Sequence, residues 1–152
     1  MWTIIKIDRK KIHLLMKDFE DKLGSPCEIY KPKIEIQHYK NNKIINKKLD
    51  LLGDYIFCFN KNFAKSSTLN FLKFSTGLKY FLQGHSLAQF EINNFVKKCK
   101  KMENDRGYII ENIFSLDVRK RYKFSSGPFT GKLFKILELN KNKLSILIGN
   151  FK

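Results

Sequence analysis

Apolar positions at the start of the chain follow first a strand-like and then a helix-like spacing. Residues 2–7 form a short apolar, β-branched run, which predicts a strand. Apolar residues then recur at helical spacing from Ile12 to Leu23. Asp8 can cap the start of the helical segment, and Gly24 is a good stop signal for the helix. The pattern predicts a strand and then an amphipathic helix.

The next segment reads as three further strands. Residues 27–37 alternate between apolar and polar positions, and Asn41-Asn42 fits a hairpin turn that leads into a return strand over 43–49. Residues 55–59, YIFCF, are aromatic or apolar at every position. That density is typical of a central strand buried on both faces.

Polar and helical patterns then alternate up to residue 108. A hydroxyl triplet caps a predicted short helix through Phe74, which Gly77 ends, and the triplet is Ser66, Ser67 and Thr68. Residues 78–82 read as a strand, and 87–102 as a helix with an apolar stripe. Its C-terminal lysines suit the helix dipole. Residues 103–108, ENDRGY, are the best linker candidate.

After residue 108 short β runs and a tight SGPFTG turn replace the helical periodicity. These features predict a small antiparallel barrel or sheet. The fold class is therefore α+β, with an N-terminal domain over 1–103 and a β module over 116–152. The segment 104–115 is either a linker or a strand that completes the module; the spacing of its isoleucines also permits a short helix.

Charge narrows the class of partner. The chain of 152 residues carries 30 Lys and Arg against 14 Asp and Glu, a net charge of +16. Such a balance points to a polyanion, either nucleic acid or an anionic membrane surface. A high lysine content also fits compositional drift in an AT-rich genome. No long apolar run or signal peptide is evident, so we expect a cytoplasmic protein without a membrane span.

Enzymatic chemistry finds no support in the residue pattern. His13, His38 and His85 lie in unrelated segments, and we interpret them as solvent-exposed. No nucleotide-binding or metalloprotease motif is present. The three cysteines are widely spaced, which argues against a zinc site or a disulfide framework. We expect no enzyme activity, no metal and no cofactor.

The order of these features resembles the NusG-like transcription elongation factors. It comprises a Trp after the initiator Met, strand and helix, KPKIEIQ with a basic hairpin, LGDYIFCF, STGLKYFLQG, the helix over 87–102, and YKFSSGPFTG. The resemblance implies a ferredoxin-like N-terminal domain (NGN) and an SH3-like barrel (KOW), whose motif residues here are Gly127, Pro128, Phe129 and Gly131. Gly53-Asp54, Phe134 and the end at Lys152 depart from the family pattern and suggest a divergent paralogue of the RfaH type.

The resemblance also implies a docking site for the clamp helices of the RNA polymerase β′ subunit. Tyr55 and Phe57 match that site, and Phe81 could lie on a neighbouring strand. Tyr55, Phe57 and Phe59 share one strand face, and the alternative is that all are core, which we favour for Phe59. The hydroxyl triplet resembles a contact with the polymerase β gate loop, although helix capping is the simpler interpretation.

Two basic sets are candidates for nucleic-acid backbone contact. Arg9, Lys10 and Lys11 begin the first helix, and the hairpin carries Lys43, Lys47 and Lys48. A solvated face is the simpler interpretation of both. Lysines supply backbone affinity with little base discrimination.

The leading hypothesis is a monomeric processivity or antitermination factor. A KOW-containing ribosomal or RNA-binding protein is the alternative. A membrane-surface binder is less favoured, because the sequence lacks the amphipathic basic helix with bulky aromatic residues that such a protein needs. By the same resemblance, the KOW module could contact the ribosome or Rho. We expect that coupling to be weak or lost, with residues 108–117 completing the barrel.

Overall fold

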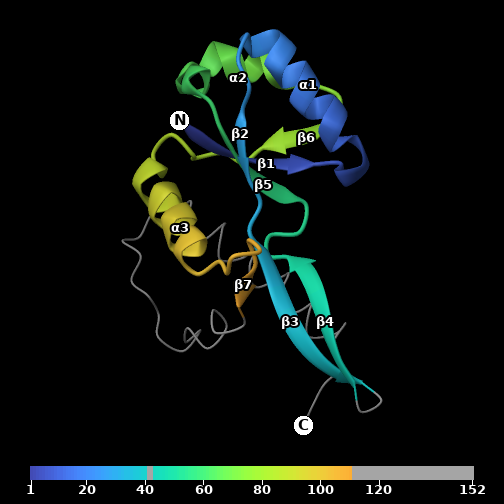
Figure 1. The fold of residues 1–152 in the computed structure, drawn as a ribbon. Coiled ribbons are helices and arrows are strands. Elements are labelled where there is room, and N and C mark those ends of the chain that lie inside the picture. Colours follow the sequence, from blue (N-terminus) through green and yellow to red (C-terminus); the bar gives the residue numbers. More distant parts are fainter. Residues whose placement is uncertain (41–42, 111–152) are drawn as a thin grey trace. The chain divides into compact units, whose positions relative to one another are not determined.

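The computed structural model describes residues 1–40 and 43–110, and these form an α+β fold (Figure 1). The chain divides into two compact units. The first, here called the sheet unit, comprises Met1–Lys31 and Asp54–Asn94. The second, the hairpin unit, comprises Pro32–Gly53 and the chain from Phe95 onward. The predicted fold class is confirmed at this level.

A four-stranded antiparallel sheet forms the centre of the sheet unit. Its order is β2 (Glu28–Tyr30), β5 (Tyr55–Phe59), β1 (Trp2–Ile7) and β6 (Leu78–Phe81). The predicted strands over 2–7 and 55–59 are confirmed with these bounds. Ile56, Phe57 and Cys58 are fully buried, so β5 is a strand covered on both faces, as the apolar density predicted.

Two helices cover one face of this sheet. Figure 1 shows α1 (Ile12–Leu23) and α2 (Ser66–Leu72) together on the same side of the strands. The core between helices and sheet is continuous, because side chains from all these elements pack into one cluster. Its buried members are Ile5, Ile7, Leu15, Phe19, Ile56, Cys58, Phe63 and Leu72.

Local sequence signals mark the start of η1 and the end of α1, but they do not mark the ends of α2. Asp8 caps the 3₁₀ turn η1 (Arg9–Lys11) by accepting a hydrogen bond from the Lys10 N–H, and α1 ends at Gly24 with φ of 65°. The predicted hydroxyl cap of α2 is wrong. Lys65 occupies the cap position without a side-chain hydrogen bond, and α2 ends at Leu72 rather than Phe74.

The hairpin unit contains a second sheet. β3 (Lys33–Lys40) pairs antiparallel with β4 (Lys43–Asp50) and parallel with β7 (Ile109–Ile110). The helix α3 (Gln89–Lys101) contributes residues 95–101 to this unit. Buried apolar residues of this unit come from β3, the turn after β4, α3 and β7, and they are Ile34, Leu51, Leu52, Val96, Cys99 and Ile109.

The alternating run over 27–37 is not one strand. It divides into β2 and β3, which belong to different sheets. Pro32 stands between them, and its lack of an N–H fits a break in the hydrogen-bond ladder. Its carbonyl instead accepts a hydrogen bond from the Leu51 N–H at 2.9 Å.

Several predictions concern residues outside the described part of the chain. They are the turn at 41–42 and the KOW-like module, including Gly127, Pro128, Phe129 and Gly131. Of the segment proposed to complete that module, Ile109 and Ile110 form a strand rather than a helix, and they pair with β3. The predicted domain boundaries stay predictions. Among the described residues, no helix has both the length and the apolar character needed to cross a bilayer.

Candidate functional site

The face of β5 that points away from α1 and α2 is aromatic, but its residues differ in access to solvent. Phe57 is fully buried, with the rings of Trp2 and Tyr30 at centroid distances of 6.4 and 6.1 Å. Phe59, which we assigned to the core, is 38% exposed. Phe57 is therefore an interior residue whose ring is not accessible to a partner. This differs from the docking role that the family resemblance implied for it.

Tyr55 lies at the other end of β5, in a row that crosses three strands. Lys6 on β1 pairs with Tyr55 on one side and with Tyr80 of β6 on the other. The two tyrosine hydroxyls are hydrogen-bonded at 2.6 Å. The Lys6 ammonium lies 5.3 Å from the Tyr55 ring centroid and 5.6 Å from that of Tyr80. We call Lys6, Tyr55 and Tyr80 together the tyrosine surface.

The surroundings of Tyr55 favour the neutral form of its hydroxyl. Burial, and then the hydrogen bond with Tyr80, raise the pKa of Tyr55 to about 12. The Lys6 cation over the rings adds a cation–π attraction, typically about 0.5–1 kcal/mol at exposed sites. Tyr80 is 42% exposed. The surface therefore offers two aromatic rings, paired hydroxyls and one positive charge to a partner.

The residue of β6 that lies near Tyr55 is Tyr80, and not Phe81 as the sequence predicted. β6 adjoins β1, not β5, and Ile5 pairs with both Ile56 and Phe81. Phe81 thus lies on the helix-covered face, stacked on Phe19 at 6.2 Å with its plane tilted by 7°. It is a core residue and does not adjoin Tyr55. Alternation along β6 implies that Tyr80 and Phe81 point to opposite faces of the sheet. The register of β6 on β1 then determines which of the two lies near Tyr55.

The hydroxyl triplet is not brought to the tyrosine surface. Ser66, Ser67 and Thr68 form the first turn of α2, with both serines exposed. That helix packs through Leu72 on the opposite face of the sheet. A single contact area that contains both Tyr55 and the triplet is therefore not supported.

The basic turn η1 does lie beside the tyrosine surface. Arg9 forms an ion pair with Asp54, which directly precedes Tyr55, and the Ile7 N–H donates to the Asp54 carbonyl at 3.0 Å. On its other side the Asp8 N–H donates to the carbonyl of Gly77 at 2.8 Å. η1 is thus held between the start of β5 and the start of β6.

Close packing at Gly77 fixes this position further. A Cβ atom at Gly77, where φ is +89°, would lie 2.9 Å from both Cβ and the carbonyl oxygen of Lys11. Only glycine allows so close an approach at such a φ. Lys10 and Lys11 are exposed, so η1 adds positive charge next to the two tyrosines.

The hairpin lysines do not form one stripe. Lys47 lies opposite Ile36 and Lys48 opposite Glu35, so these two consecutive residues point to opposite faces of the hairpin. Lys43 shares the face of Lys47 by the same alternation. The Lys48 ammonium lies 4.6 Å from the ring centroid of Tyr108, and both residues belong to the hairpin unit.

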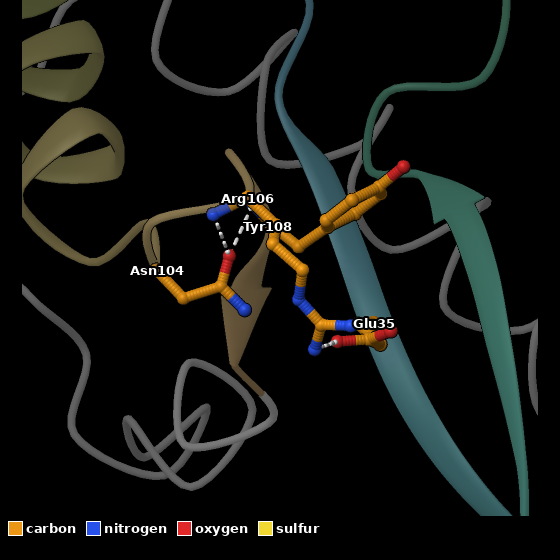
Figure 2. Close-up of polar contacts among 4 residues, drawn as sticks. All are labelled: Glu35, Asn104, Arg106 and Tyr108. Carbon is orange, nitrogen blue, oxygen red and sulfur yellow. Dashed lines mark hydrogen bonds and ion pairs between the residues drawn. The ribbon is translucent and has the colours of Figure 1, made fainter.

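The predicted linker over 103–108 is a tight turn fixed to the hairpin (Figure 2). The side-chain oxygen of Asn104 accepts hydrogen bonds from the Arg106 and Tyr108 N–H groups, both at 3.0 Å. The Arg106 guanidinium forms an ion pair with Glu35 at 2.7 Å. The Glu35 side chain is only 10% exposed, and its second oxygen has no hydrogen-bond partner. Arg106 therefore compensates a largely buried charge.

The described residues contain no group of three potential metal ligands. His85, which we expected to be exposed, is buried, and its Nδ1 lies 3.2 Å from the Leu82 carbonyl oxygen. Burial lowers the pKa of His85. The arrangement of the described residues is suited to binding through aromatic rings and cations.

Neither a protein-family model nor a curated protein matches the sequence.

Proposed function

We propose that the protein is a transcription elongation factor of the NusG-like type that binds the RNA polymerase clamp and promotes processivity or antitermination. The proposal takes residues 1–103 as the NGN-like domain and residues 116–152 as the KOW-like module. The observation that carries it is the tyrosine surface, which presents Tyr55 on the sheet face not covered by α1 and α2. The order of elements along the chain gives independent support.

The physical case rests on the side chains of the tyrosine surface. Tyrosine is enriched at binding hot spots because a large, rigid ring buries much area at little entropic cost. The Oη–Oη hydrogen bond orients both rings before a partner arrives, which lowers the cost of binding. A factor that binds one polymerase conformation better than another shifts the population toward it. Binding to the closed clamp would therefore discourage pausing without any catalytic step.

Nucleic-acid contact is the second part of the proposal. Lys10 and Lys11 are exposed on η1, which adjoins the starts of β5 and β6, and we expect them to meet phosphates close to the polymerase. We expect sequence-tolerant affinity that falls steeply with salt, because counterion release drives it. Replacing Arg9, Lys10 and Lys11 by Ala should flatten the slope of log affinity against log salt by up to about 2–3 units. The matched control replaces three exposed lysines around α2, namely Lys61, Lys65 and Lys73.

A KOW-containing RNA-binding protein of the ribosome is the second candidate, because a net charge of +16 is ordinary for that class. Sedimentation of the full chain with core RNA polymerase, and separately with ribosomal RNA, at rising salt distinguishes the two. The elongation-factor proposal predicts that polymerase binding survives at salt concentrations where RNA binding is lost. Retention on ribosomal RNA together with loss from polymerase would favour the second candidate.

A further inference from the structure

Two of the three cysteines are brought together in the sheet unit, although 30 positions separate them in sequence. Cys58 is the penultimate residue of β5 and is fully buried, whereas Cys27 directly precedes β2 and is half-buried. The register pairs Ile29 of β2 with Cys58. Cys27, two residues earlier, is therefore the diagonal neighbour of Cys58 on the same face of the sheet.

Local contacts hold this arrangement. The two thiols are hydrogen-bonded to each other, and both side chains pack into the core beneath α1 and α2. The Asn60 side-chain amide donates to the Ser25 hydroxyl at 3.1 Å and to the Pro26 carbonyl at 3.4 Å. The same side chain is hydrogen-bonded to Cys27. The segment before β2 is thus fastened to the end of β5.

The two thiols differ in how readily they ionise. Hydrogen bonds from Cys58 and then Asn60 lower the pKa of Cys27 and outweigh its partial burial. The hydrogen bond with Cys27, together with burial, raises the pKa of Cys58. Cys27 is therefore the accessible and more readily ionised thiol, and Cys58 is a protonated thiol next to it.

We propose that Cys27 and Cys58 form a reversible redox site that hydrogen peroxide converts into a disulfide between β2 and β5. The Cys27 thiolate attacks one peroxide oxygen, so that an S–O bond forms, the O–O bond breaks, and hydroxide leaves and takes up a proton as water. The Cys58 sulfur then attacks the Cys27 sulfenic acid. The S–S bond forms, the S–O bond breaks, and the hydroxyl leaves as water with the Cys58 proton. Two thiols lose two electrons in total, and one peroxide becomes two water molecules.

The disulfide needs a small backbone adjustment. Diagonal neighbours in a regular sheet have Cα atoms about 7–8 Å apart, while disulfides span about 4.4–6.8 Å. Cys27 lies outside the β2 ladder, so a backbone shift of about 1 Å breaks no strand pair and strains only the Asn60 contacts with Ser25 and Pro26. The bond would close a loop that contains the whole β3–β4 hairpin. This site is independent of the tyrosine surface and of the proposed function.

The test treats the full-length protein with hydrogen peroxide near neutral pH, alkylates the remaining thiols, and measures intact mass and peptide maps without reductant. We expect loss of the mass of two hydrogen atoms, a linked peptide that contains Cys27 and Cys58, and full reversal by dithiothreitol. Cys99→Ser is the matched control, because Cys99 is a buried cysteine of α3, and it should leave the linkage unchanged.

Two variants separate the steps. Cys27→Ser should abolish the linkage, and Cys58→Ser should accumulate a Cys27 sulfenic acid that dimedone traps. If Cys58→Ser fails to fold, the wild-type peptide map and Cys27→Ser decide the question, since Cys27 is only half-buried. A wild-type protein that shows no linkage, a linkage that includes Cys99, or sulfinic acid at Cys27 without a disulfide would overturn the proposal.

Discussion

Phe57 and Phe59 lie on the same face of β5, and the structure assigns them opposite roles that truncation can separate. Phe57 is fully buried and meets the rings of Trp2 and Tyr30. Phe59 is 38% exposed at the end of the strand, with the Trp2 ring 5.3 Å away. Phe57→Ala should therefore leave a cavity under the aromatic face, whereas Phe59→Ala should only expose part of one contact.

The expected magnitudes differ enough to measure. Truncating a fully buried phenylalanine costs about 3–5 kcal/mol, since lost transfer energy and the residual cavity add. A half-exposed ring loses only a fraction of that, and about 0.5–1.5 kcal/mol is expected for Phe59→Ala. Because domains have only about 5–15 kcal/mol of net stability, Phe57→Ala should leave a marginally folded protein.

Urea unfolding followed by far-UV circular dichroism measures both changes in the free energy of unfolding. Trp2 is the single tryptophan of the chain, so its fluorescence reports independently on the packing around Phe57. Phe57→Leu provides a milder variant, with an expected cost of about 1–1.5 kcal/mol, if the alanine variant does not fold. Equal costs for Phe57→Ala and Phe59→Ala would refute the assignment of Phe57 to the interior.

Three further predictions concern backbone packing, titration and a buried charge. Gly77→Ala should cost about 2–4 kcal/mol in thermal or urea unfolding, and at least about 1 kcal/mol more than Gly24→Ala; both positions have positive φ, but a Cβ at Gly24 meets nothing within 4 Å. Burial raises the pKa of Tyr55 to about 12 in the folded state, so the stability present below the unfolded pKa of about 10 is lost as pH rises through about 12. Tyr55→Phe should remove the latest step of the tyrosinate absorbance titration and this alkaline loss; an unchanged titration would contradict the burial of its hydroxyl. Arg106→Ala should cost about 1–3 kcal/mol, because it leaves the Glu35 carboxylate buried and unpaired, and adding Glu35→Gln should recover part of that loss; a cost below about 0.5 kcal/mol would show that the ion pair is dispensable.

Much of the local structure was predictable because it depends on short-range signals. Strand alternation and apolar density gave β1 and β5 with their observed bounds, and helical spacing with Gly24 gave α1. The return strand predicted over 43–49 matches β4 to within one residue, whereas the run predicted over 27–37 divides into β2 and β3. The elements that match have a consistent period and clear stop residues, so tertiary packing had little to override.

The candidate site was less predictable, because it depends on pairing between distant strands. Tyr80 joins Tyr55 through β1, and no local signal in the sequence sets the register of β6. The same register places Phe81 in the core. The family resemblance, not alternation, implied a docking ring at Phe57, and alternation alone does not show what covers a sheet face. The turn over 103–108 resembles a linker in sequence because its order comes from the Asn104 side chain and from a distant ion pair.

The most direct test of the proposed docking role is the affinity of the full-length chain for an isolated β′ clamp-helix segment, measured by titration calorimetry. The wild-type protein should bind, and Tyr55→Ala and Tyr80→Ala should each weaken binding by about 1–3 kcal/mol. Phe74→Ala, which removes an 87% exposed ring just after α2, is the control and should bind as the wild type does. Unchanged affinity of a folded Tyr55→Ala variant, or no binding by the folded wild-type protein, would contradict the proposal.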